Sequence, residues 1–307
     1  MTNNILSGTR TCVTLGALLA ASLASGTAFA GAALDRVRDS GTLRLAYVEQ
    51  AKPFTSPGSN GGVEGYGAEL CGRIATQVKS QLGLQQLNVQ WIPVGIEAAM
   101  GAIAGGEADL LCTPANATLE RRKSVSFSIP AFAGGIRAVV RSDATTQLRD
   151  VLEAKVTDRP VWRGSPALTL LEKTRFAAVA GTTSEKTLAR RVATFKLNTA
   201  TVSVPDYASG IKFLLERKID VFLADRDVVL AAMDDSARPK LLVLNRQMTH
   251  EPLALALPRG DEDFRLLVDT VLTAAFTAPD FATVYGKYFG RLDEGSKQFF
   301  SWAAPAP

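Results

Sequence analysis

The amino-acid sequence predicts an α/β protein with two similar lobes, each a mostly parallel sheet flanked by helices. Strand and helix patterns alternate along the chain with short connections, which is typical of parallel sheets covered by helices. The same alternation starts again at Ile136. Residues 102–113 and 214–225 also resemble one another, because each segment reads as a helix end, a turn and a buried strand.

In the first half, apolar residues recur at helical or strand spacing in several segments. A loop over 52–62, rich in proline, glycine, serine and asparagine, precedes the longest helical pattern. That pattern has its apolar face at positions 70, 74, 78 and 82 and ends at Gly83. We therefore expect, in order, a helix over 34–39, a strand over 42–48, this long helix, a strand over 87–94, a helix over 97–104 and a strand over 109–112.

The second half repeats this order of elements. The segment 145–173, which contains Trp162 and Arg163, has no counterpart in the first half, and we expect it to be a surface addition to the second lobe. The patterns predict strands over 136–141, 176–180, 202–204, 219–224 and 253–257, and helices over 184–195, 208–217 and 263–276.

Composition narrows the classes of function. With 307 residues and 47% apolar content, the chain can bury a substantial core. The net charge of +4 is small and no dense block of Lys and Arg is present, so nucleic-acid binding is not expected. One histidine and three cysteines, without HExxH or CxxC spacing, predict neither a metal site nor a catalytic set, and no cofactor is expected.

The first thirty residues are typical of a secretory signal peptide. Arg10 precedes an apolar, small-residue segment over 12–26, and Ala28-Phe29-Ala30 is an A-x-A cleavage site. The alternative is an uncleaved membrane anchor, but the apolar segment is short and rich in alanine. We therefore expect export to the periplasm and a mature chain that begins at Gly31.

Two cysteines remain after cleavage, Cys71 and Cys112. An even pair in an exported protein is compatible with a disulfide, which would close a loop of about 40 residues and add roughly 4 kcal/mol of stability. Two buried thiols that pack as small apolar groups are an equally good interpretation.

The segment 108–130 is the strongest candidate for a functional site. A short buried strand opens into small or polar residues, and Thr118 is placed to cap a helix whose first turn contains Arg121. Ligands of open α/β sheets collect beyond the carboxyl ends of the strands. Hydroxyl groups, free backbone groups and a guanidinium at this point predict a site for a carboxylate or another anion.

This segment resembles the family 3 periplasmic solute-binding proteins of polar amino-acid ABC transporters, most closely their glutamate/aspartate-binding branch. The matching residues are Thr118, Glu120, Arg121, Phe127, Ser128 and Pro130. The resemblance implies a type II periplasmic-binding-protein fold, with lobe 1 formed by 31–135 plus 251–307, lobe 2 by 136–250, and two hinge strands near 133–138 and 250–255. It also implies a monomer that captures a small amino acid and delivers it to an inner-membrane permease.

The resemblance also assigns roles in the site. It places Arg121 at the ligand's carboxylate, Asp225 at its ammonium group, and Thr182 and Thr183 on the second-lobe turn that closes over the carboxylate. Each residue has a structural alternative: an ion pair with Glu120 for Arg121, and a helix cap for Asp225 and for Thr183.

Positions at which this sequence departs from the family pattern limit which ligands are expected. Pro114 and Asn116 stand where the family has Ser or Thr, so we expect the Asn116 amide to replace a lost donor. Val48 and Ala99 stand where the glutamate/aspartate branch has arginines, Ile96 where it has a serine, and Tyr207 where it has a histidine. An uncharged side chain on the ligand is therefore expected. The expected ligand-binding residues are Arg121, Asp225, Thr183, Thr182, Asn116, Pro114, Thr118, Phe54, Ile96 and Tyr207, with Met100 as a further wall residue and Tyr66 as a core residue.

Two other functions stay open at this point. The family includes exported dehydratases that act on small cyclic carboxylates, in which a buried acid transfers a proton. A ligand-sensing partner of a membrane receptor is the other alternative. The only histidine, His250, lies beside a predicted hinge and belongs to no evident catalytic set.

Overall fold

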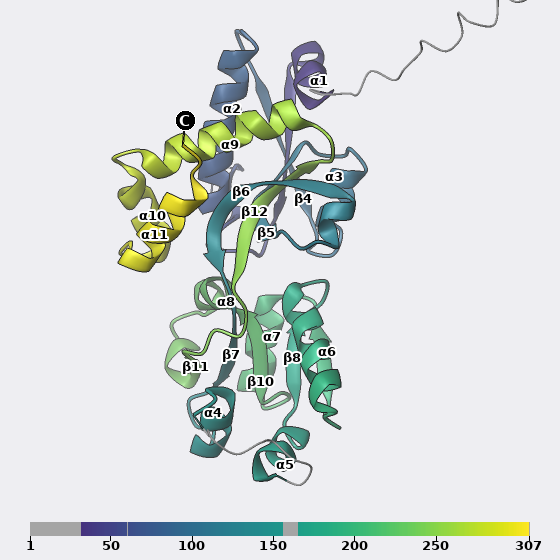
Figure 1. Cartoon of the computed structure of the whole chain (residues 1–307), viewed down its shortest axis with the longest axis vertical. Helices are drawn as coiled ribbons and strands as arrows, with labels where there is room; N and C mark the ends of the chain where they lie inside the picture. The colour runs from purple at the N-terminus through teal and green to yellow at the C-terminus, as the bar shows by residue number, and fades with distance from the viewer. Residues whose placement is uncertain (1–31, 60, 156–164, 307) are drawn as a thin grey trace, which may run out of the picture.

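The computed structural model describes residues 32–59, 61–155 and 165–306. The predicted signal peptide, Trp162 and Arg163 lie outside these residues. Figure 1 shows the chain arranged in two halves, one above the other, each built around its own sheet.

The upper half in Figure 1 contains a five-stranded sheet. Strands β4, β1 and β5 pair in parallel, whereas β12 pairs antiparallel with both β5 and β6. Across the sheet, the order is β4 (Asn88–Val94), β1 (Thr42–Val48), β5 (Leu110–Asn116), β12 (Glu251–Pro258) and β6 (Val125–Gly134).

The lower half contains the second five-stranded sheet. Strands β10, β8 and β9 pair in parallel, and β7 pairs antiparallel with β10 and β11. Across the sheet, the order is β11 (Leu241–Val243), β7 (Ile136–Arg141), β10 (Val221–Asp225), β8 (Phe176–Val179) and β9 (Thr201–Val204).

Both sheets are therefore mixed, with a parallel set of three strands, whereas the sequence predicted mostly parallel sheets. The antiparallel pairings involve the strands that cross between the halves. In each sheet, the carboxyl ends of the three parallel strands point towards the other half. A strand that enters from the other half therefore runs antiparallel to them. Strands β7 and β12 both enter in this way, and no local pattern in the sequence marks their direction.

The crossings are short. Only Gly135 separates β6 from β7, and β12 returns beside β6 with Glu251 opposite Gly134 and Pro252 opposite Ala133. These crossings lie where two hinge strands were expected, near 133–138 and 250–255.

Helices cover both sheets (Figure 1). Most predicted elements are present within two residues of their expected ends, and β1 and β7 have the predicted bounds. The upper half contains α1 (Ala32–Ser40), α2 (Tyr66–Gln81), α3 (Ala99–Ala104), α9 (Glu262–Thr277), α10 (Phe281–Phe289) and α11 (Glu294–Ala303). The lower half contains α4 (Thr146–Leu152), α5 (Pro166–Glu172), α6 (Thr183–Phe195), α7 (Tyr207–Leu215) and α8 (Arg226–Ala232).

Helix α2 is fastened to β5 by a disulfide between Cys71 and Cys112, with their Cα atoms 6.0 Å apart. Gly67 permits this approach, because a side chain there would collide with the carbonyl oxygen of Cys112. The disulfide interpretation of the cysteine pair thus holds in the structure, and the bridge lies directly before the polar end of β5.

The segment 145–173 supplies α4 and α5 at the end of the lower half that is farthest from the crossings (Figure 1). Leu148 and Leu152 of α4 are buried against the second sheet, so this segment also completes a core. Among the described residues, no single helix has the length and apolar character to cross a membrane.

Candidate ligand-binding site

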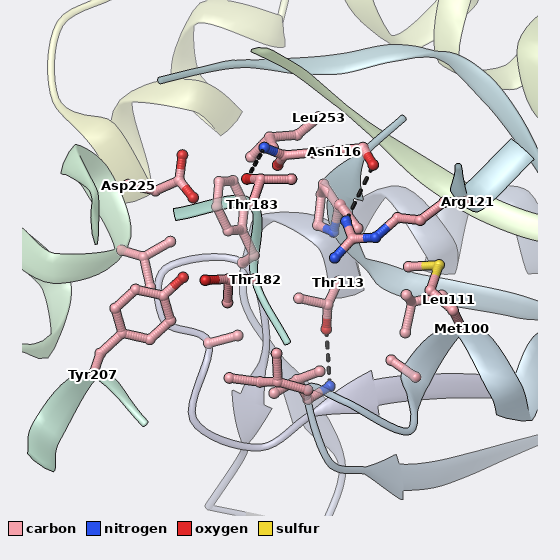
Figure 2. A pocket seen from close by; sticks show the side chains of 18 residues that line it. Met100, Leu111, Thr113, Asn116, Arg121, Thr182, Thr183, Tyr207, Asp225 and Leu253 are labelled. Carbon is pink, nitrogen blue, oxygen red and sulfur yellow. Dashed lines mark hydrogen bonds between the residues drawn. The ribbon is translucent and has the colours of Figure 1, made fainter. Parts of the chain in front are cut away.

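A pocket lies between the two sheets, with a cavity volume of about 80 Å³. This volume holds several water molecules and suits a small solute. Figure 2 shows Asp225 and Tyr207 on one side and Arg121 and Met100 on the other. Its lining comes from both halves: Val48, Ala51, Phe54, Ile96, Ala99, Met100, Leu111, Thr113, Pro114, Ala115, Asn116, Arg121, Thr182, Thr183, Tyr207, Asp225, Val228 and Leu253.

The pocket brings together every residue of the predicted set except Thr118. Tyr66, expected in the core, lies there: it is fully buried and donates a hydrogen bond of 3.0 Å from its hydroxyl to the Ala131 carbonyl. Thr118 acts one step away, because its Oγ1 accepts a hydrogen bond of 3.2 Å from the Arg121 N–H. Thr118 therefore orients Arg121 without lining the cavity.

Arg121 begins a single 3-10 turn, η1 (Arg121–Lys123), and not the α-helix that the sequence predicted. The chain has room for only one turn, because β6 starts at Val125. The guanidinium donates to the Asn116 carbonyl (3.1 Å) and, across the pocket, to the Gly181 carbonyl (3.3 Å).

The ion-pair interpretation of Arg121 is wrong, since Glu120 pairs with Lys186 of the other half at 2.5 Å. No salt bridge to Arg121 is present among the described residues. Burial lowers the pKa of Arg121, and the negative charge of Glu251 is the largest effect that opposes this. A ligand carboxylate would give this buried cation its direct partner.

The N-terminus of α6 faces the pocket beside Arg121. Thr182 is the N-cap: its Oγ1 accepts from the Glu185 N–H (3.4 Å) and donates to the Val179 carbonyl (2.6 Å). The cap is thus Thr182, and Thr183, for which the sequence left a capping role open, is free to present its hydroxyl to the pocket. The positive end of a 13-residue helix also favours an anion here.

Asn116 connects the two halves. Its Nδ2 donates to Thr183 Oγ1 at 2.6 Å and also to the Glu251 carboxylate. A carboxylate only accepts hydrogen bonds, so this contact fixes the orientation of the amide. Both N–H groups of Asn116 are used, and its oxygen is the remaining group. A donor role was expected for Asn116, whereas in this structure its side-chain oxygen is the group without a partner among the described residues.

Asp225 ends β10 and precedes α8, so it occupies an N-cap position, yet its side chain makes no capping hydrogen bond. Its Oδ1 is buried and has no hydrogen-bond partner among the described residues. Burial, and next the charge of Glu251, raise the pKa of Asp225 to about 6. A carboxyl group with one buried, unpartnered oxygen is suited to a ligand's ammonium group.

Tyr207 places a phenol hydroxyl on the same side of the pocket as Asp225 (Figure 2). It is buried at the start of α7 and packs edge-on against Phe222 with ring centroids 6.4 Å apart. Burial, reinforced by the charge of Asp225, raises the pKa of Tyr207 far above its ordinary value. Its hydroxyl therefore stays protonated and can serve as a hydrogen-bond donor.

The wall beyond Arg121 is apolar. Val48, Ala99, Ile96 and Met100 all line it. Its hydroxyl, on Thr113, is already engaged: it accepts from the Val48 N–H (2.8 Å) and bonds the Thr55 hydroxyl (2.5 Å). Thr55 donates its own proton to the Val48 carbonyl (2.8 Å), so the Thr113 proton goes to Thr55. The Thr113 hydroxyl therefore has no free proton to donate to a charged side chain of the ligand.

Sequence reasoning missed two residues that approach the site from β12. Leu253 lines the pocket and Glu251 holds Asn116, although 135 positions separate Glu251 from Asn116 in the chain. The one sequence signal for this strand was the predicted hinge strand near 250–255. In the described part of the chain, no cluster of three or more His, Cys, Asp or Glu side chains could hold a metal ion.

Comparison with known proteins agrees with this architecture. The model of the bacterial extracellular solute-binding proteins, family 3, matches residues 43–291. The chain belongs to this family, and its fold is the type II periplasmic-binding-protein fold. An ancestral arginine-binding protein bound to arginine superposes with a TM-score of 0.65 at 21% identity, covering 81% of this chain and 99% of that one.

Two curated proteins that are similar to this chain are named for different activities. The L-glutamate/L-aspartate-binding protein of Pseudomonas aeruginosa is 24% identical over 83% of this chain and 79% of its own length. The cyclohexadienyl dehydratase of the same organism is 24% identical over 79% of this chain and 80% of its own length.

Proposed function

We propose that this protein is the periplasmic substrate-binding component of an amino-acid ABC transporter. It captures a small amino acid or a related zwitterion between its two lobes and delivers it to a membrane permease. The proposal extends the family's amino-acid binding to this chain, and it includes a monomeric state and export through a cleaved signal peptide.

One observation carries the proposal: the half-buried guanidinium of Arg121 and the carboxyl group of Asp225, whose Oδ1 is buried, face one pocket from opposite halves, and neither forms a salt bridge with another described residue. Arg121 and the N-terminus of α6 suit the ligand's carboxylate, and the unpartnered Oδ1 of Asp225 suits its ammonium group. Either charge would be costly to bury alone, and a zwitterion compensates both.

The ligand's side chain is uncharged in this proposal. Apolar residues occupy the wall at Val48, Ile96, Ala99 and Met100, and the Thr113 hydroxyl is already bonded. A carboxylate or ammonium group placed there would lose its hydration without gaining a partner. The P. aeruginosa relative is named for glutamate and aspartate, and this chain would differ from it in specificity.

Ligand capture operates through closure of the two lobes. Contacts already cross the pocket from Arg121 to Gly181, from Asn116 to Thr183 and from Glu120 to Lys186. A ligand held from both sides stabilises the closed arrangement, and bending at the short crossings opens it. The permease recognises the closed form.

The proposal is tested by thermal-shift screening of the mature protein against the twenty standard amino acids. A ligand at a hundred times its Kd adds about 2.7 kcal/mol to the free energy of unfolding, which gives a clear rise in Tm. The proposal predicts this rise with one or a few uncharged amino acids. No rise with any of the twenty would contradict it.

One observation favours a second candidate, an exported dehydratase-like enzyme acting on a small cyclic carboxylate. Asp225 is a buried acid with a pKa of about 6, which suits proton transfer near neutral pH. The cyclohexadienyl dehydratase of P. aeruginosa is 24% identical to this chain over 245 residues. Incubation with cyclohexadienyl carboxylates, followed by mass spectrometry, separates the candidates, because only an enzyme consumes the compound.

A further inference from the structure

We propose that Glu251 is a positioning residue that makes the pocket select ligands with a positively charged group. It acts through Asn116 and Asp225, and it does not line the cavity itself. This inference rests on the proposed function, because it concerns how the same site recognises the ammonium end of its ligand.

Glu251 lies at the crossing between the two halves, close to the residues that hold the pocket together. It is the first residue of β12, directly opposite Gly134 at the crossing between the halves. Its carboxylate accepts a hydrogen bond from Asn116 Nδ2, which also donates to Thr183 of the other half. Because both N–H groups of Asn116 are then bonded within the protein, its amide oxygen is the group that remains for the ligand. An amide oxygen accepts hydrogen bonds, as an ammonium group requires.

The charges around the pocket also favour a ligand with an ammonium group. Arg121 is a single cation, whereas Asp225 and Glu251 are two acids whose electrostatic influence reaches both it and each other. A ligand that has a carboxylate but no ammonium group would add negative charge to this pocket without placing a cation beside the two acids, which is unfavourable. An ammonium group near Asp225 and the Asn116 oxygen relieves this excess.

The surroundings of Asp225 define which groups control its protonation. After burial, the negative charge of Glu251 is the largest effect that raises the pKa of Asp225, whereas a hydrogen bond donated by the Gly135 N–H lowers this pKa. Removing the charge of Glu251 therefore lowers the pKa of Asp225. The groups that face Asp225 from the elements packed against it are Arg121, Tyr207, Asp227, Glu251 and the Gly135 N–H.

The first test needs no ligand. The Asp225 carboxyl carbon is titrated by NMR in the wild-type protein, in Glu251→Gln and in Glu251→Asp. We expect the midpoint to fall in Glu251→Gln, which keeps an acceptor for Asn116 but has no charge, and to return towards the wild-type value in Glu251→Asp. An unchanged midpoint in Glu251→Gln overturns the inference, whatever the outcome of the amino-acid screen.

The second test measures selectivity. The probes are the standard amino acid that gives the largest thermal shift and the 2-hydroxy acid with the same side chain, which lacks the ammonium group. In the wild-type protein, the Kd of the amino acid should rise about tenfold from pH 7.5 to pH 5, because only about a tenth of Asp225 is charged at pH 5.

In Glu251→Gln, this rise should shrink to about twofold if the midpoint falls by about one unit, and discrimination against the hydroxy acid should weaken by about tenfold. Glu172→Gln is the matched control, since Glu172 is exposed at the end of α5, away from the pocket. It should behave as the wild-type protein does. The same pH profile and the same discrimination in Glu251→Gln would overturn the inference, whereas absence of amino-acid binding to the wild-type protein would count against the proposed function.

Discussion

The side-chain amide of Asn116 donates a 2.6 Å hydrogen bond to the Thr183 hydroxyl, and this bond joins the two halves of the protein across the pocket. Asn116 ends β5 of the upper sheet, and Thr183 begins α6 of the lower half. The contact is buried, so its loss leaves polar atoms without partners in the closed form. It is therefore expected to stabilise that form.

Substitution of Thr183→Val should weaken ligand binding without unfolding the protein. Loss of one cross-pocket hydrogen bond costs about 1 kcal/mol, which corresponds to about a fivefold higher Kd. Isothermal titration calorimetry with the best-binding amino acid measures the change. Thr169→Val, on the exposed side of α5, is the control and should bind as the wild type does. Equal Kd values for the two variants would show that the contact is unimportant for closure.

Substitution of Asp225→Asn should abolish binding and stabilise the ligand-free protein. The folded-state pKa of Asp225, about 6, lies above its unfolded value of 3.8. Protonation is therefore favoured in the folded state, and stability is lost as the pH rises from the unfolded pKa through the folded one. The variant should gain on the order of 3 kcal/mol at pH 8 and little below pH 4.

Denaturant unfolding at the two pH values tests this statement. Asp263→Asn, at an exposed position on α9, is a suitable control. A variant that is no more stable than the wild type at pH 8 would argue against a destabilising buried carboxylate at position 225.

The disulfide should stabilise the upper half without contributing to affinity. Its loop spans a sequence separation of 41 residues, so replacement of both Cys71 and Cys112 by Ala should cost about 4 kcal/mol. Addition of reductant to the wild-type protein should lower Tm in the same direction and leave the double variant unaffected. A wild-type Tm insensitive to complete reduction would contradict this account of the bridge.

The sequence-based prediction was accurate where local patterns decide the structure. The alternation in β1 and the apolar face of α2 are local features, and both elements occur as expected. The predictions for Arg121 and Asp225 combined strand ends with a family resemblance, and both residues line one pocket. Short α8, α10 and α11 were missed, because their signals are weak or fall outside the repeated order of elements.

Relationships between distant segments were not predictable from local pattern. Glu251 reaches Asn116 only because β12 returns to the upper sheet between β5 and β6. Both hydrogen bonds donated by the Asn116 amide go to residues far away in the sequence, Thr183 and Glu251, so no local pattern could show that its N–H groups are engaged. The same holds for the mixed character of the sheets, which depends on the direction of the crossing strands.

The apolar wall should determine side-chain specificity. Substitution of Met100→Lys places an unpaired ammonium group in this wall, which should raise the Kd for uncharged amino acids at least about tenfold. Binding of glutamate should weaken less or improve. Leu266→Lys, at a position that is 66% exposed, is the control. Unchanged selectivity in Met100→Lys would place the ligand's side chain elsewhere.

The central claim is that Arg121 binds the carboxylate of an amino acid held between the lobes. The most direct measurement is the Kd of the best-binding amino acid for Arg121→Ala and for Arg122→Ala, its neighbour in η1 whose Nε donates to the Ala117 carbonyl. Loss of a buried charge partner costs about 3 to 5 kcal/mol, so Arg121→Ala should raise the Kd by more than about a hundredfold with the fold intact. Arg122→Ala should bind normally. Wild-type affinity in a folded Arg121→Ala protein would contradict the account.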